Sequence, residues 1–208
     1  MARFRKQFDA RANWPRFRLN RPEEAFDPRK YLEFRLFWPY SSGLPCQWMS
    51  HQIDTVAWLT GDPYPKSCVA SGGIYQWKDG RRNPDTFTAV FEYPSGFQVQ
   101  YHARQTNAFG GTAETYFSNW GTLDLERGVI TGAGGGGAGK KLAERSIPRA
   151  EGTDHMLNWM ECVRSRRRPN ADIEAGYSHA VAVSMAARAL HSGRRVEFDA
   201  KRRRIIPA

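Results

Sequence analysis

The sequence predicts an α+β fold, an open and mostly antiparallel β-sheet with helices packed on one face. Between Thr86 and Arg104, apolar and polar residues alternate on both sides of a Pro-Ser-Gly turn, which is typical of a hairpin with one buried and one exposed face. Apolar residues with helical spacing occur in three other segments, two of which follow the strands. Strands and helices that are grouped rather than alternating favour an α+β arrangement.

The strands predicted around this hairpin are Ser67–Trp77, Ala113–Leu125 and, before a basic tail, Arg195–Phe198. The side chains expected on the buried face of the hairpin are Phe87, Ala89, Phe91 and Tyr93 in its first strand and Phe97, Val99, Tyr101 and Ala103 in its second. The opposite face of the hairpin is polar.

A helix expected at Cys46–Leu59 has two chemically distinct sides. At about 100° per residue, one side carries Met49, Ile53 and Val56. The opposite side carries a narrow polar stripe made of Gln47, His51, Asp54 and Trp58. Gly61 and Pro63 then end the helix. The polar residues are therefore organised along one line of the helix rather than scattered.

Two more helices are predicted towards the end of the sequence, at about Asp154–Arg164 and Ile173–His191. Their expected packing faces are Met156, Met160 and Val163 in the first and Ala180, Val183, Ala187 and Leu190 in the second. A glycine-rich run at 132–141, predicted as a flexible loop, precedes them. It matches Gly-x-Gly-x-x-Gly, but Pro148 follows too soon for the packed helix that a phosphate-binding loop needs. We therefore assign no cofactor-binding residue to this chain, and no metal ligand.

Two domains or segments are expected: an extended arm or linker at residues 1–40, rich in Arg, aromatic residues and Pro, and the α+β domain at 41–208. The arm is expected to wrap an apolar surface, anchored by Asn13-Trp14, Phe26 and Tyr31.

No apolar run approaches the ~20 residues of a membrane helix, and no signal-peptide core follows the basic start. We expect a cytoplasmic protein.

The composition leaves two interpretations of a strong positive charge. The 31 Lys and Arg residues exceed the 21 Asp and Glu residues and give a net charge of +10. A basic surface can bind nucleic acid, but none of the usual nucleic-acid-binding motifs is present, so a solvated basic surface is favoured.

The three cysteines lack the spacing of a disulfide framework or a zinc site. We interpret Cys46, Cys68 and Cys162 as buried reduced thiols.

The order of several short motifs resembles the second, C-terminal domain of the glucose–fructose oxidoreductase/inositol dehydrogenase family. The matching segments are Phe26–Tyr31, Phe34–Gly43, Trp48–Asp54, Gly72–Asp79, Pro84–Thr86, Phe91–Pro94, His155–Asn158 and Arg164–Glu174. Family members begin with a Rossmann domain that binds NAD or NADP. This sequence resembles only the second domain and the arm leading into it, so we expect NAD or NADP to require a missing or separate Rossmann domain.

The resemblance implies roles for six residues. His51 aligns with the histidine that exchanges a proton with the substrate hydroxyl, and Asp54 would orient its ring or hold its charged form. Relatives often have a carboxylate where this chain has Gln47, which can bind a hydroxyl but cannot accept a proton. The other expected substrate-binding residues, at the mouth of the pocket, are Arg35, Trp38 and Tyr40. Packing in the core and arm is the alternative role for Trp38, and a polar helix surface is the alternative for His51.

Two functions therefore stay open. The first is the substrate-binding and catalytic half of an NAD(P)-dependent oxidoreductase acting on a sugar or polyol hydroxyl, inactive without its nucleotide-binding domain. The second is a non-catalytic oligomerisation or sugar-binding module derived from that domain. In both cases we expect a homo-oligomer, because relatives pair their sheets face to face, and a carbohydrate-like ligand. The first also requires a Rossmann-domain partner.

Overall fold

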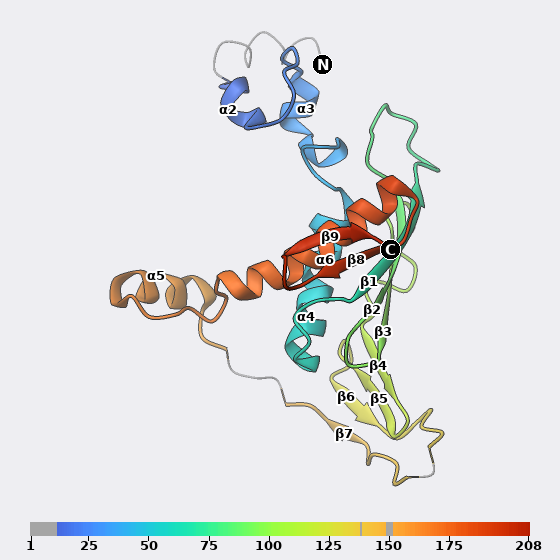
Figure 1. Ribbon diagram of the computed structural model, residues 1–208. Coiled ribbons are helices and arrows are strands. Elements are labelled where there is room, and N and C mark those ends of the chain that lie inside the picture. Colours follow the sequence, from blue (N-terminus) through green and yellow to red (C-terminus); the bar gives the residue numbers. More distant parts are fainter. Residues whose placement is uncertain (1–11, 138, 149–151) are drawn as a thin grey trace. The chain divides into compact units, whose positions relative to one another are not determined.

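The computed structural model describes residues 12–137, 139–148 and 152–208. By its internal contacts, the chain divides into a larger unit, Met1–Thr106 with Ile173–Ala208, and a smaller unit, Asn107–Asp172 (Figure 1). Residues 1–11 of the predicted arm lie outside the described residues. Each unit is described by itself below.

The larger unit is built on a five-stranded sheet of order β3-β2-β1-β8-β9, with every neighbouring pair antiparallel. Its strands are β1 (Ser67–Gly73), β2 (Thr86–Glu92), β3 (Gln98–Arg104), β8 (Val196–Asp199) and β9 (Arg204–Pro207). The predicted hairpin is confirmed, because Phe91 of β2 pairs with Cys68 on one side and with Val99 on the other. The predicted face is also confirmed, since Phe87, Phe91 and Tyr93 are buried.

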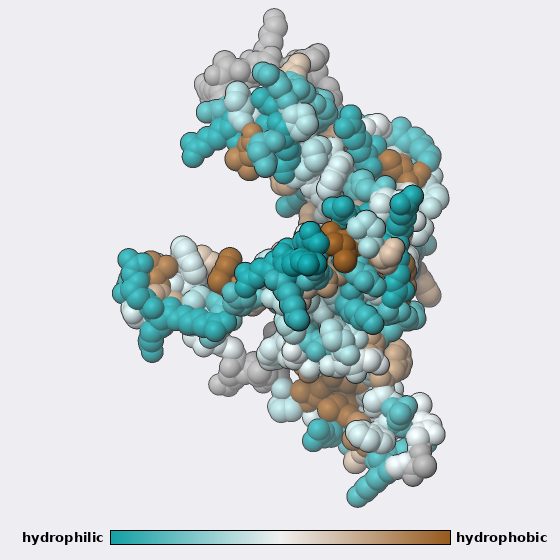
Figure 2. All heavy atoms as spheres, in the orientation of Figure 1, coloured by the Kyte–Doolittle hydropathy of each residue, from teal (hydrophilic) through white to brown (hydrophobic). Residues whose placement is uncertain are grey.

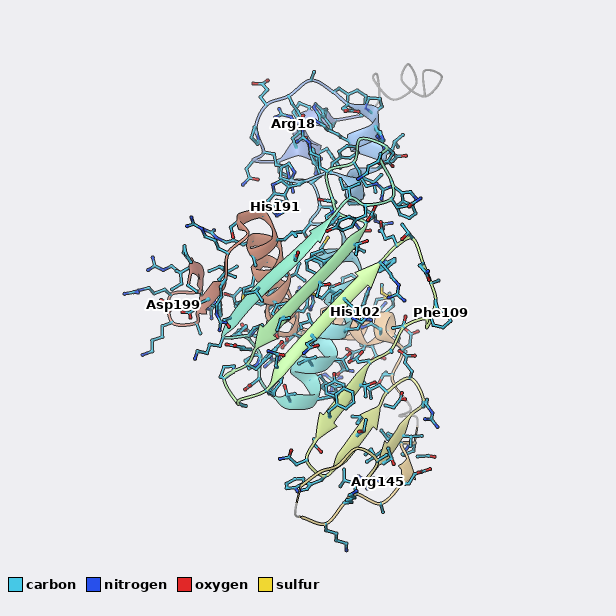
Figure 3. All side chains as sticks on the ribbon, turned by 90° about the vertical axis from the view of Figure 1, so that its right-hand side faces the viewer. Arg18, His102, Phe109, Arg145, His191 and Asp199 are labelled. Carbon is cyan, nitrogen blue, oxygen red and sulfur yellow. The ribbon has the colours of Figure 1, made fainter. Side chains whose placement is uncertain are left out.

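Two helices, α4 (Ser50–Thr60) and α6 (Ile173–Ser192), contact each other, and α6 lies against β1 and β8. Figure 3 looks onto the opposite, open face of the sheet, with both helices behind the strands. The predicted α+β fold with helices on one face is therefore confirmed for this unit. Met49, Ile53 and Val56 of the α4 region are buried, as their spacing predicts.

Helix α6 packs with a different face from the one predicted. Ala180 is exposed and Val183 and Leu190 are only half-buried. The buried side chains are Ser178, Val181, Ala182, Met185, Ala186, Ala187 and Ala189. The cause lies in the neighbours: the buried face is the one that meets the sheet and α4, and small alanines fill much of it, whereas the larger apolar side chains that define the predicted face lie to the side.

The start and end of α4 follow from local chemistry. A π-helical turn, η2 (Pro45–Met49), leads directly into α4. The helix ends at Gly61, which has a φ of 76° and whose N–H donates to the Ala57 carbonyl at 3.0 Å. A left-handed residue at this position favours glycine, so the predicted stop is confirmed.

The prediction of a basic tail after Phe198 is partly wrong. Residues Arg204–Pro207 form the edge strand β9, with Ile205 opposite Phe198 and Ile206 opposite Glu197. The two isoleucines supply the half-buried apolar positions of this strand. The run of basic residues before them hides this short strand in the sequence.

Residues 12–40 contain short helical turns: α2 (Trp14–Arg18), α3 (Pro28–Leu32) and the 3₁₀ turn η1 (Phe34–Leu36). Their aromatic side chains pack against one another rather than along an extended arm. This arm cluster consists of Trp14, Phe17, Phe26, Tyr31, Phe34 and Tyr40. Trp14 lies at its centre and is 6% exposed.

The smaller unit contains a four-stranded antiparallel sheet of order β4-β5-β6-β7. Its strands are β4 (Thr115–Ser118), β5 (Gly121–Asp124), β6 (Val129–Thr131) and β7 (Arg145–Ser146). The single strand predicted at 113–125 is thus two strands with a turn at Asn119 and Trp120 between them. The predicted helix is confirmed as α5 (His155–Ser165), but none of its side chains is buried.

The cysteines correct another expectation. Cys68 is buried, which raises the pKa of its thiol to about 12, whereas Cys46 is exposed and Cys162 is partly exposed. All three are free thiols.

Among the described residues, no helix has the length and apolar character needed to span a membrane.

Candidate functional site

The predicted polar stripe lies on the exposed side of α4. His51 and Asp54 are both exposed, and Trp58, one turn further on, is 80% exposed. Ile53 and Val56 lie on the opposite side at 2% and 5% exposure. The amphipathic pattern therefore presents an imidazole, a carboxylate and an indole to one surface of the larger unit.

Gln47, the first residue of the predicted stripe, lies in the π-helical turn before α4, and its amide is already engaged. Its Nε2 donates to the backbone carbonyl of Arg35 at 3.3 Å and to the hydroxyl of Ser41 at 3.4 Å. The amide thus ties the start of α4 to the segment that carries Arg35. Its Oε1 is the acceptor that stays available for a hydroxyl donor.

A second amide holds the same segment, and sequence reasoning missed it. Asn83 is 3% exposed, and its Nδ2 donates to the carbonyls of Arg35 at 2.8 Å and Ser41 at 2.9 Å. Its backbone N–H also donates to the Leu36 carbonyl. Because two side-chain amides meet at one carbonyl, the backbone of Arg35 is fixed beside Gln47, while the Arg35 side chain itself is exposed.

The loop between β1 and β2 is organised by a buried carboxylate. Asp85, with no exposed surface, accepts hydrogen bonds from the backbone N–H groups of Tyr75, Gln76 and Trp77 and from the Thr86 hydroxyl. Burial alone would raise the pKa of this carboxyl, but the hydrogen bonds outweigh it and lower the pKa to about 2.

This loop in turn contacts the segment before α4. Arg29 of α3 forms an ion pair with Asp79 at 3.2 Å, and Arg82 donates its backbone N–H to the Leu36 carbonyl. The Arg81 guanidinium lies 4.5 Å from the centre of the Trp77 ring. Asp85 therefore helps to hold Arg35 in place through a rigid loop. The Pro-Asp-Thr sequence at 84–86 was the available signal for this role, although its function could not be inferred from the sequence.

Asp54 has a titratable neighbour on a second helix, while its proposed relation to His51 stays a prediction. Its Oδ1 lies 3.5 Å from Nδ1 of His179, on α6. Sequence reasoning missed His179 because it placed the packing face of α6 elsewhere. The structure therefore brings His51, Asp54 and His179 to neighbouring positions across the contact between α4 and α6.

The remaining predicted residues, Trp38 and Tyr40, face different neighbours. The Trp38 ring is 41% exposed and lies 4.2 Å from the ring of His191 near the end of α6. The Tyr40 hydroxyl donates to the Glu24 carboxylate, and its ring stacks on Phe17 in the arm cluster. Burial, and then this carboxylate, raise the pKa of Tyr40 to about 12. Tyr40 therefore belongs to the packing of residues 12–40 as much as to any pocket.

The glycine-rich run lies in a different structural context from a dinucleotide-binding loop. It lies between β6 and β7, two strands of the smaller unit. Its Gly137 N–H donates to the Asn119 carbonyl, and Gly135 donates to Gly132. A dinucleotide loop instead joins a strand to a helix and points its N–H groups at the phosphates. Within the part of the chain that the structure describes, no cluster of three or more metal-ligating side chains occurs either.

Comparison with known proteins gives a family match. Residues 9–130, more than half of the 208 residues, match the family model described as the GFO/IDH/MocA C-terminal domain. No curated protein matches the sequence at a significant level.

Solved structures share the fold at low sequence identity. An NAD-binding protein from Listeria innocua is 16% identical with a TM-score of 0.59, and the match covers 79% of this chain and 50% of that one. UDP-N-acetylglucosamine 3-dehydrogenase GnnA from Acidithiobacillus ferrooxidans is 16% identical with a TM-score of 0.55, covering 80% of this chain and 50% of that one. WlbA dehydrogenase from Bordetella pertussis, in complex with NADH and UDP-GlcNAcA, is 17% identical with a TM-score of 0.53, covering 74% and 44%. The chain spans about half the length of these proteins.

Proposed function

The chain belongs to the GFO/IDH/MocA family, and we propose that it is the substrate-binding and catalytic half of an NAD(P)-dependent oxidoreductase acting on a sugar or polyol hydroxyl. The observation that carries the proposal is His51, an exposed imidazole on a rigid helix within the family-matched residues. A nucleotide-binding domain, in another part of a longer protein or in a separate chain, would hold the cofactor. We expect the cytoplasm to be its compartment.

The role proposed for His51 is proton transfer. Oxidation of an alcohol to a carbonyl removes the hydroxyl proton, and a group that titrates near neutrality is suited to accept it. His51 is free to do so because its ring projects from the side of α4 opposite to the buried residues Ile53 and Val56. In the reverse reaction the protonated ring returns the proton to the alkoxide oxygen.

Substrate binding is proposed for the side chains around the start of α4. Oε1 of Gln47 would accept a hydrogen bond from a hydroxyl, and the exposed guanidinium of Arg35 would donate to one. The half-exposed ring of Trp38 would stack on a sugar ring. Tyr40 would contribute through its ring, because its hydroxyl is engaged by Glu24. The similar folds of a UDP-N-acetylglucosamine dehydrogenase and of WlbA support nucleotide-linked sugars as first test substrates.

Self-association is proposed through the open face of the larger unit's sheet. Val69, Thr88, Gln100 and His102 are among the exposed side chains there (Figure 3). This face is also the observation that favours the second function, a non-catalytic oligomerisation or sugar-binding module. Light scattering checks the oligomer directly: a dimer or larger species is expected, and a 23.7 kDa monomer at micromolar concentration would exclude it.

The experiment that tests the catalytic role replaces His51 by alanine. The chain is assayed with the nucleotide-binding domain of a family member, supplied in trans or as a fusion. Loss of the proton acceptor is expected to lower the turnover rate by about 10²–10⁴-fold. The free energy of unfolding should change by no more than about 0.5 kcal/mol, because the side chain is exposed.

The matched control is His155→Ala, which removes an exposed histidine from the smaller unit. It should leave both turnover and stability unchanged. If His51→Ala retains the parental rate, the proton acceptor is another residue. If neither version of the chain turns over a sugar or polyol while both bind it, the non-catalytic sugar-binding function is the correct one.

A further inference from the structure

The contact between Asp54 and His179 joins the candidate site to a second helix. The side chain of Asp54 is 53% exposed and that of His179 is 35% exposed. His179 lies on α6, and Asp54 lies one turn after His51 on α4. Residues three apart on a helix are neighbours, with Cβ atoms about 5–6 Å apart. His51, Asp54 and His179 therefore form a continuous row of titratable side chains.

The two nitrogens of the His179 ring have different surroundings. Nδ1 is buried and has no hydrogen bond, and Oδ1 of Asp54 lies 3.5 Å from it. This separation is longer than a normal hydrogen bond, so the contact is electrostatic. The side chain as a whole is 35% exposed, so the part of the ring away from the buried Nδ1 accounts for this exposure, and we take Nε2 as the nitrogen that can meet a ligand.

A negative charge near Nδ1 favours one of the two tautomers of the ring. It favours the tautomer with a proton on Nδ1, in which Nε2 has a free lone pair. Such a nitrogen accepts a hydrogen bond from a hydroxyl group. An exposed pair of this kind contributes little to folding stability, so stability alone is a poor reason for it.

We propose that His179, positioned by Asp54, is a further substrate-binding residue whose Nε2 accepts a hydrogen bond from a second hydroxyl of the substrate. On the substrate, this second hydroxyl would be adjacent to the hydroxyl that gives its proton to His51. The preferred substrate class is therefore a polyol or sugar with adjacent hydroxyls. Asp54 is then a positioning residue for His179 rather than for His51. This inference rests on the proposed function of the α4 stripe.

A nuclear magnetic resonance titration of the isolated chain tests the inference without turnover. The five histidines give five imidazole signals, which substitution of single histidines assigns. The probes are myo-inositol, which has adjacent hydroxyls throughout, and UDP-N-acetylglucosamine. With either probe, the signals of His51 and His179 should both shift with saturation, whereas those of His102 and His155 should stay in place.

The outcomes separate the two proposals. If the His51 signal shifts and the His179 signal does not, the substrate-binding role of His179 is wrong and the proposed function stands. If neither signal shifts with either probe at millimolar concentration, both proposals fail.

Kinetics with a supplied nucleotide-binding domain give a second readout. His179→Ala and Asp54→Asn should each raise KM by about tenfold, as expected for one lost hydrogen bond, with little change in kcat. Because the two residues act through one contact, the KM of the double variant should be no higher than that of either single variant. The conservative variant Asp54→Glu should keep a KM close to that of the parent. The control on the same helix is Ser184→Ala, an exposed position. Lower melting temperatures with unchanged KM would show that the pair only ties α4 to α6.

Discussion

Helices α5 and α6 both carry apolar residues at helical spacing, but their surroundings differ. In α6, Met185, Ala186 and Ala189 have no exposed surface. In α5, Met156, Trp159 and Met160 are between 43% and 57% exposed. The same contrast extends to the sheets: Phe87 and Phe91 in the larger unit are fully buried, whereas Phe117 in the smaller unit is 82% exposed.

The difference in burial follows the neighbours of each helix. Helix α6 contacts β1, β8 and α4, all within one unit. The apolar side of α5 stays at the surface, as the brown side chains of Figure 2 show for the segment that carries it. A helical pattern identifies which face is apolar, but a second element must be present to bury it. We therefore expect the larger unit to supply most of the folding stability.

The largest expected effect compares two phenylalanines. Phe91→Ala removes a fully buried ring from β2 and should lower the free energy of unfolding by about 3–5 kcal/mol. Phe117→Ala removes an 82% exposed ring from β4 and should change it by no more than about 0.5 kcal/mol. Urea denaturation of both variants measures the difference. Equal losses would mean that Phe117 is buried by a partner in solution, and the comparison of the units would fail.

A smaller effect concerns two carboxylates whose pKa values move in opposite directions. In the larger unit, the pKa of Asp85 is lowered to about 2 from an ordinary 3.8. Its stabilising contribution is therefore present above pH ~4 and is lost as the pH falls towards 2, with a size of about 2 kcal/mol. In the smaller unit, burial raises the pKa of Glu114. Its contribution has the opposite sign: it is present at low pH and is lost as the pH rises through the raised pKa.

Two variants test these signs. Asp85→Asn should be destabilised at pH 7 and should lose the steep fall in stability between about pH 4 and pH 2. Glu114→Gln should be as stable as the parent, or more stable, at pH 7. Urea denaturation at a series of pH values checks both, and a stabilising Asp85→Asn substitution at neutral pH would contradict the role given to that carboxylate.

The predictable part of the fold was the part governed by local repetition. Alternation of Phe87, Ala89 and Phe91 is visible in the sequence because each side chain points to the same face of one strand. The edge strand β9 was not predicted, because Ile205 and Ile206 follow a basic run and acquire their partners only from β8. The packing face of α6 was misassigned for a related reason: which side of the helix is buried depends on neighbours that the helix sequence does not specify.

In the candidate site too, some features could be predicted from local sequence spacing and others depend on long-range packing. The side of α4 that carries His51 and Asp54 followed from helical spacing alone. The partner of Asp54 did not, because His179 lies 125 residues later in the sequence on another helix. The two amides on the Arg35 carbonyl, from Gln47 and Asn83, depend equally on long-range packing. Motifs therefore indicated the candidate residues for chemistry, and the structure identified the side chains that contact them.

The most direct measurement of the central claim is reconstitution of hydride transfer. The chain is mixed with, or fused to, the nucleotide-binding domain of a family member, and NAD(P)H absorbance is followed with sugars, polyols and UDP-N-acetylglucosamine as substrates. The account predicts saturable NAD(P)H formation that needs both components and is abolished by His51→Ala. Turnover that persists in His51→Ala, or a folded complex that binds substrate and cofactor without forming NAD(P)H, would contradict it.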